Sequence, residues 1–185
     1  MDIEQAIRSR RTHKAYGPEP VARETLAELF ELARWAPNHH LTNPWRFRVL
    51  GPRALERLKR AAGDLAAADA ERADAAEVAR VAAAKLDRAP TLVVCSMVRS
   101  DDPVEMEEDR HATAVAAYIV LLVAHGRGLA GYWRTPAVLR TQAGREAVGL
   151  GADEEFVGLL HLGRAKQSAE APDREPAVRY TTFLD

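Results

Sequence analysis

The sequence has a single cysteine, few aromatic residues and almost no net charge. Cys95 cannot close an internal disulfide, so we expect a packed thiol and a reducing compartment. The 26 Lys and Arg residues against 27 Asp and Glu leave a formal charge of −1, which provides no field to attract nucleic acid or anionic lipid. No apolar run reaches the roughly 18 residues of a spanning helix, and the acidic start of the chain is unlike a signal peptide. We therefore expect a cytoplasmic protein that binds neither nucleic acid nor membrane.

Several catalytic motifs are also missing. No Gly-x-Gly-x-x-Gly follows a predicted strand, no P-loop is present, and no serine lies in a nucleophile elbow, which disfavours a Rossmann fold and a hydrolase. Glu107, Glu108, Asp109 and His111 could gather a divalent ion, but an acidic stretch is more often solvated, so we predict no metal site. At 185 residues the chain predicts a single domain over 1–185.

Hydrophobic periodicity predicts alternating helices and strands. Apolar residues at helical spacing predict helices over 2–9, 23–35 and 110–127, the last apolar on nearly all sides and suited to a subunit interface. Strands are expected over 46–50, 91–98, 131–134 and 155–163, with 91–98 covered on both faces. A loop with two prolines and two histidines, 36–45, precedes the first strand.

The remaining segments are less apolar. Residues 52–88 predict one or two exposed helices with weak attachment to the core, which could roof a pocket. Residues 101–109 read as an acidic loop, and Thr135-Pro136 as the start of a helix that ends near 149–151. The tail from 171 to 185 has no pattern for a core element, so we expect it to wrap over another surface.

Polar and aromatic residues gather at three element ends: Arg10-Arg11-Thr12, His39 to Trp45, and Trp133-Arg134-Thr135. Guanidinium groups can bind a phosphate, hydroxyls can hydrogen-bond the polar groups of a ligand, and aromatic side chains can pack against a flat ring. Together these residues indicate a flat ligand that carries a phosphate. Taken singly, the arginines could merely cap a helix and the tryptophans could belong to the core. A small helical interaction domain without a ligand therefore stays open.

Four segments in order carry a resemblance to a known family: 7–12, 36–39 together with 43–47, 131–135 and 157–163. On these, the sequence resembles the flavin-dependent nitroreductase superfamily, and within it the compact single-domain branch of NAD(P)H nitroreductases. The resemblance spans almost the whole chain. It implies an α+β fold with a central mixed β-sheet flanked by helices, and a C-terminal tail extending onto a dimer partner.

The resemblance also implies site residues. One subunit would bind FMN through Arg10, Arg11, Thr12, Trp133, Arg134 and Thr135, and its partner would add Trp35 and His39. NAD(P)H would contact Val123, Ala124, His125, Gly126, Arg127 and Gly128. Thr12 stands where serine is usual and keeps the hydroxyl, whereas Trp35 stands where related chains can carry arginine.

The implied function is hydride transfer from NAD(P)H through flavin N5 to a nitroaromatic, quinone or related acceptor, with no catalytic side chain. Because one pocket would hold both substrates in succession, we expect ping-pong turnover in a homodimer with FMN at the interface. The alternative is a flavin-binding or storage protein without catalysis.

Overall fold

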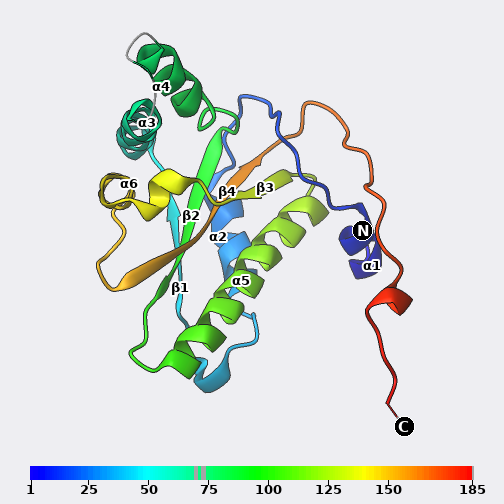
Figure 1. Cartoon of the computed structure of the whole chain (residues 1–185). Coiled ribbons are helices and arrows are strands. Elements are labelled where there is room, and N and C mark those ends of the chain that lie inside the picture. Colours follow the sequence, from blue (N-terminus) through cyan, green and yellow to red (C-terminus); the bar gives the residue numbers. More distant parts are fainter. Residues whose placement is uncertain (69–70, 72–73, 185) are drawn as a thin grey trace.

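The computed structural model describes residues 1–68, 71 and 74–184 of the chain (Figure 1). Residues 69, 70, 72 and 73, which belong to the stretch 52–88, and Asp185 at the end of the predicted tail lie outside the described residues. The helices and strands follow one another as α1 (Ile3–Ser9), α2 (Arg23–Ala33), η1 (His39–Leu41), β1 (Trp45–Val49), α3 (Pro52–Ala67), α4 (Ala75–Ala84), β2 (Thr91–Val98), α5 (Pro103–Gly126), β3 (Ala130–Arg134), η2 (Ala137–Arg140), α6 (Gln142–Val148), β4 (Glu154–Gly163) and η3 (Ala177–Arg179).

The four strands form one sheet in the order β1-β2-β4-β3. All three pairings are antiparallel, so the expected mixed sheet is antiparallel in its named strands. A parallel pairing occurs only as an isolated bridge between Thr12 and Gly131 within the described chain. β2 lies between two strands and is buried from Thr91 to Met97, which confirms the prediction of a strand covered on both faces. The sheet also excludes a small helical domain.

Helices cover both faces of the sheet (Figure 1). On one face α2 and α5 pack through Leu29, Ala116 and Val120, which are fully buried. On the other face α3 and α6 enclose a second cluster that includes Leu58 and Leu86. Leu58 is buried on α3, so the prediction of weak core attachment is wrong for this helix. Over its described residues, Ala75–Ala84, α4 has no buried residue, as expected for an exposed helix, and Leu86 is buried just after its end.

Helix boundaries differ from expectation in two places because of capping groups. The predicted acidic loop 101–109 is helical from Pro103, since the Asp102 side chain accepts hydrogen bonds from the backbone N–H groups of Val104 and Glu105 at 2.8 and 3.1 Å. The helix expected at 135–136 begins instead at Gln142, where Thr141 is the N-cap. Gly149, at φ 70°, ends that helix within the predicted range.

A buried ion pair joins β1, β2 and β4. Arg48 donates to both carboxylate oxygens of Glu154, and the Ser96 hydroxyl donates to Oε2 at 2.5 Å. Burial alone would raise the pKa of Glu154, but the hydrogen bonds from Arg48 and Ser96 outweigh it and hold the pKa below its usual range. The edge strand β1 is thereby held to the centre of the sheet.

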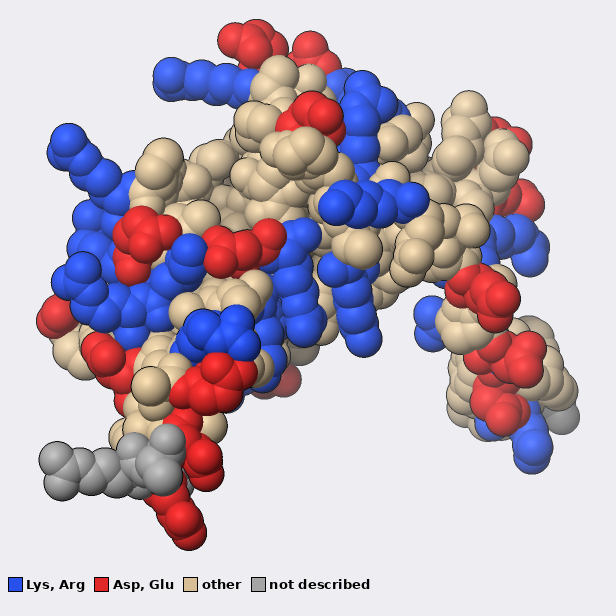
Figure 2. Space-filling view, turned by 90° about the horizontal axis from the view of Figure 1, so that it is seen from above, with Lys and Arg blue, Asp and Glu red and all other residues tan. Residues whose placement is uncertain are grey.

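The C-terminal segment adds nothing to the core. Its side chains are exposed from 170 to 184, and its only regular element among the described residues is the short turn η3. Figure 2 shows this segment standing away from the main body, over which basic side chains lie beside acidic ones. Val178, Tyr180 and Phe183 are thus apolar side chains without a local core.

Candidate functional site

The segment 10–12 lies beside the beginning of β3, the edge strand that continues into the segment 133–135. Thr12 bridges to Gly131, and the backbone N–H of His13 donates to the Gly131 carbonyl at 3.2 Å. Gly131 permits this arrangement because a Cβ there would come within 2.6 Å of Leu121 Cδ2 on α5. The structure therefore places the first of the three segments along the strand that leads into the third.

An arginine-rich cavity of about 860 Å³ opens beside this edge. Its walls come from α1, α5 and the tail: Glu4, Ile7, Arg8, Arg10, Arg11, Tyr118, Pro172, Asp173, Arg174 and Tyr180. Arg11 donates to the carbonyls of Arg8 and Arg10 at 2.7 and 2.8 Å, so it does cap α1. Within the described chain the Arg10 side chain makes no such bond and is available to an anion.

Trp133 and Arg134 leave β3 on opposite faces, as successive strand residues do. Trp133 packs on the α5 face over Gly158, where a Cβ would lie 2.2 Å from the indole Nε1. Arg134 donates to the carbonyl of Lys85, after α4, at 3.3 Å. Gly158 therefore leaves room for the indole ring of Trp133. Arg134 links β3 to the segment that follows α4.

The predicted NAD(P)H segment 123–128 does not form one surface. Ala124 is fully buried, and His125 Nε2 lies 2.7 Å from the Ser9 hydroxyl on α1. Burial, followed by the charges of Arg10, His13 and Arg11, lowers the pKa of His125. Arg127 instead pairs with Glu28 on α2.

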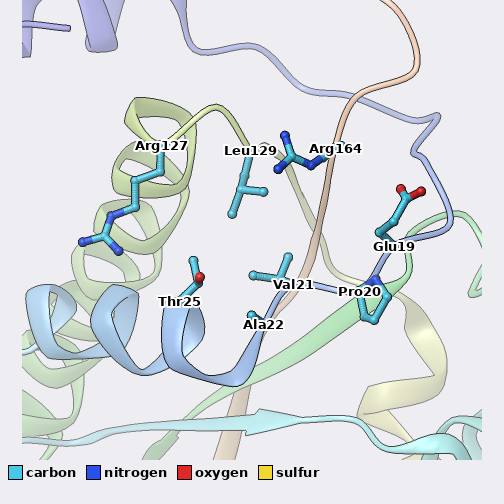
Figure 3. Close-up of a pocket in the computed structure, with 8 residues that line it drawn as sticks. All are labelled: Glu19, Pro20, Val21, Ala22, Thr25, Arg127, Leu129 and Arg164. Carbon is cyan, nitrogen blue, oxygen red and sulfur yellow. The ribbon is translucent and has the colours of Figure 1, made fainter.

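Arg127 also lines a separate cavity of about 440 Å³ (Figure 3). The other residues that line this cavity are Glu19, Pro20, Val21, Ala22, Thr25, Leu129 and Arg164. The six predicted residues therefore divide between the core, the α1 side and the α2 side of the molecule.

His39 lies at the other end of α5, and Trp35 precedes it by four residues in the chain. Trp35 is 72% exposed, with the Arg34 guanidinium 5.2 Å from the centre of its ring. His39 Nδ1 is 2.7 Å from Glu108 Oε2. Because Ser9 contacts α5 at His125 and His39 contacts it at Glu108, the two contacts are separated by about 25 Å of helix at 1.5 Å per residue. One protomer does not bring these two groups together.

The sequence reasoning missed His161 as an individual residue, although it lies in the quoted segment 157–163. His161 is fully buried opposite Tyr132, whose ring centre is 5.6 Å away, and neither ring nitrogen has a hydrogen-bond partner among the described residues. Burial, followed by the charges of Arg134 and Arg88, lowers its pKa to about 4. His161 is therefore a neutral group beneath the β3 edge. A lone histidine in an apolar strand carries no spacing signal that could have identified it.

Comparisons with known proteins agree with this architecture. A family model described as the Nitroreductase family matches residues 7–164, so the chain belongs to the nitroreductase family. The Bacillus subtilis protein YfhC, named as a candidate NAD(P)H nitroreductase, is 25% identical over 177 residues, which are 94% of this chain and 90% of YfhC. The similarly named YdjA of Escherichia coli is 28% identical over 183 residues, which are 96% of this chain and 98% of YdjA.

Solved structures share the fold. A nitroreductase-like family protein from Bacillus cereus superposes with a TM-score of 0.86 at 22% identity, covering 100% of this chain and 97% of its own. The nitroreductase NfnB from a Sphigopyxis strain, described as FMN and NADPH-dependent, gives a TM-score of 0.79 at 18% identity and full coverage of both chains. Among the described residues, no helix combines the length and apolar content that crossing a bilayer requires.

His161 predicts a pH dependence of stability. The folded protein keeps His161 neutral down to about pH 4, whereas the unfolded chain takes up the proton near the ordinary pKa of 6.5. As the pH falls from 6.5 to 4, the free energy of unfolding therefore decreases, by up to about 3 kcal/mol from this residue.

Urea denaturation at several pH values measures this effect. The free energy of unfolding should decrease less steeply with falling pH in His161→Leu than in the wild type. His40→Asn is the matched control and should keep the wild-type slope, because His40 is exposed and asparagine tolerates its positive φ. The same slope in the His161 variant would contradict this prediction.

Proposed function

We propose that this protein is an FMN-dependent oxidoreductase that uses NAD(P)H to reduce nitroaromatic, quinone or related acceptors. The observation that carries the proposal is the pairing of Thr12 with β3, next to an arginine-lined cavity with Arg10 and Arg11 in its wall, in a chain of the nitroreductase family. NfnB is described as FMN and NADPH-dependent, which supports the choice of cofactor and reductant. The cytoplasmic location expected from the sequence stays a prediction.

The residues present fit both the phosphate and the ring system of FMN. Arg10, with Arg8 and Arg174 on the same cavity wall, offers guanidinium groups to a phosphate. Trp133, lying over the space that Gly158 leaves free, offers a flat face to a ring system. No dinucleotide motif is present, so the proposal is FMN and not FAD.

When bound, FMN would supply N5 as the hydride acceptor and donor. The protein's part is to hold the phosphate through Arg10 and Arg11, to offer the Thr12 and Thr135 hydroxyls to polar groups, and to restrict water with Trp133. Arg134, tied to the carbonyl of Lys85, would bind from the opposite face of the strand. No side-chain acid or base is required. Of the proposed NAD(P)H residues, Gly126, Arg127 and Gly128 are exposed and available for contact.

We propose that two protomers complete each site. His39 contacts the end of α5 opposite to Ser9, so a two-fold partner with its α5 antiparallel would place His39, and Trp35 four residues before it, beside the arginines of the first protomer. The outward stripe of α5 contains His111, Val115 and Tyr118, spaced by four and three residues, and all three are exposed. The exposed apolar tail would cross to the partner and cover part of this surface.

Arg10→Ala should weaken FMN binding about 10- to 100-fold, because a charge-assisted hydrogen bond to phosphate is lost. The dissociation constant is measured from flavin fluorescence during dilution of the holoprotein. Arg80→Ala is the matched control, since Arg80 is exposed on α4 and pairs with Glu77. Unchanged affinity in Arg10→Ala would show that Arg10 does not bind the phosphate. Recovery of FAD by mass spectrometry would refute FMN as the cofactor.

Rapid mixing with NADPH and then with a nitroaromatic tests the reaction itself. If one pocket holds the two substrates in succession, NADPH alone should bleach the flavin absorbance completely, and the acceptor should restore it after NADP⁺ has left. Parallel double-reciprocal plots should follow in the steady state. A storage protein would show slow reduction or none, and intersecting plots would refute the ping-pong scheme.

Dilution should release flavin and dissociate the dimer together, because each site would need both protomers. Sedimentation velocity over a concentration series, recorded at protein and flavin wavelengths, measures both species. Added FMN should shift monomer to dimer. Flavin bound stoichiometrically to a monomer would show that the site is not shared.

A further inference from the structure

The loop that carries His39 has an unusual backbone. His40, Leu41 and Asn43 have φ angles of 55°, 53° and 50°, in the left-handed region that residues other than glycine rarely adopt. The loop also keeps large side chains exposed, with Leu41 75% accessible to solvent. A conformation of this kind persists only when surrounding contacts determine it.

Those contacts converge on one buried carboxylate. Asp109 on α5 is 4% exposed, and its Oδ1 accepts hydrogen bonds from Thr42 Oγ1 at 2.5 Å and from Asn38 Nδ2 at 3.2 Å. Asn38 Oδ1 accepts in turn from the backbone N–H of Asn43 at 2.7 Å. Asp109 thus holds both ends of the segment 38–43 against α5.

The preceding residue on α5 holds the ring of His39. Glu108 Oε2 lies 2.7 Å from His39 Nδ1, and a carboxylate can only accept, so Nδ1 carries the hydrogen. The neutral ring then presents Nε2, on its far side, as an acceptor. The His39 side chain is 61% exposed, so this nitrogen can serve a group outside the protomer.

We infer that Asp109 and Glu108 are the positioning residues of His39: Asp109 sets the loop backbone, and Glu108 sets the orientation and tautomer of the ring. The inference rests on the proposed function, in which His39 reaches the FMN of the neighbouring half-site. A neutral His39 would accept a hydrogen bond from an N–H or O–H group of that ligand. Asp109 and Glu108 touch neither ligand nor acceptor and act through His39.

A double-mutant cycle on FMN affinity separates this role from a purely structural one. Asp109→Ala should weaken FMN binding about tenfold in the wild-type background and leave it unchanged in the His39→Ala background. Asp109→Asn keeps an oxygen acceptor at the same place and should recover most of the affinity. Glu107→Ala is the matched control, because Glu107 is exposed and forms no hydrogen bond to the loop in the described part of the chain.

Two further measurements keep the test decisive if Asp109→Ala folds poorly. Thr42→Val removes the shorter hydrogen bond with little change of volume and should weaken FMN binding in the same His39-dependent way. Nitrogen NMR of the imidazole should show hydrogen on Nδ1 of neutral His39 in the wild type. That preference should be lost in Glu108→Ala and retained in Glu107→Ala, whether or not flavin is bound.

The outcomes distinguish the inference from the function on which it rests. If His39→Ala binds FMN as the wild type does, the proposed contact between His39 and flavin is wrong, and the positioning role falls with it. If His39→Ala weakens FMN binding but the Asp109 and Thr42 variants bind as the wild type does, only the positioning role is overturned. The same holds if those variants weaken binding equally in the wild-type and His39→Ala backgrounds. An unchanged His39 tautomer in Glu108→Ala would overturn the role of Glu108.

Discussion

The packing of α5 against the sheet is the constraint on which the rest of the structure depends. Its inward face is built largely of small residues, with Ala116, Ala117 and Ala124 fully buried, so the helix lies close to β3 and β4. Gly131 makes the same approach possible from the strand. Because α5 is long and rigid, its two ends become fixed points. One end holds α1 through His125 and Ser9, and the other holds the 38–43 loop through Asp109.

This constraint explains why the candidate site is divided. The arginines that could bind phosphate lie near the end of α5, whereas His39, which could contact the edge of a ring, lies where α5 begins. A helix of this length keeps them apart in one chain and aligns them in an antiparallel pair of chains. The exposed stripe on α5 and the apolar tail are both surfaces that such a pair would cover. Cofactor binding and association would then be one thermodynamic process.

Local patterns were reliable where one interaction decides the structure. The apolar run 91–98 could only be a covered strand, and Gly149 could end a helix because it adopts a positive φ. Sequence patterns failed where a helix-capping side chain or a few apolar residues decided the local structure. The acidic residues after Asp102 are favourable in a first helical turn, so a stretch that reads as a solvated loop is helical. In α3, the buried Leu58 attaches a largely charged helix to the core, whereas α4 is exposed as expected.

The sequence by itself determined the alternation of helices and strands, the absence of a dinucleotide motif, and the three segments with binding chemistry. These depend on residues close together in the chain, whose spacing is visible as written. Only the tertiary structure decided that Thr12 pairs with Gly131, that Arg134 donates to the carbonyl of Lys85, and that Asp109 belongs to the loop of His39. Those relations join residues far apart in the chain, and no local periodicity encodes them, because the packing of α5 on the sheet creates them.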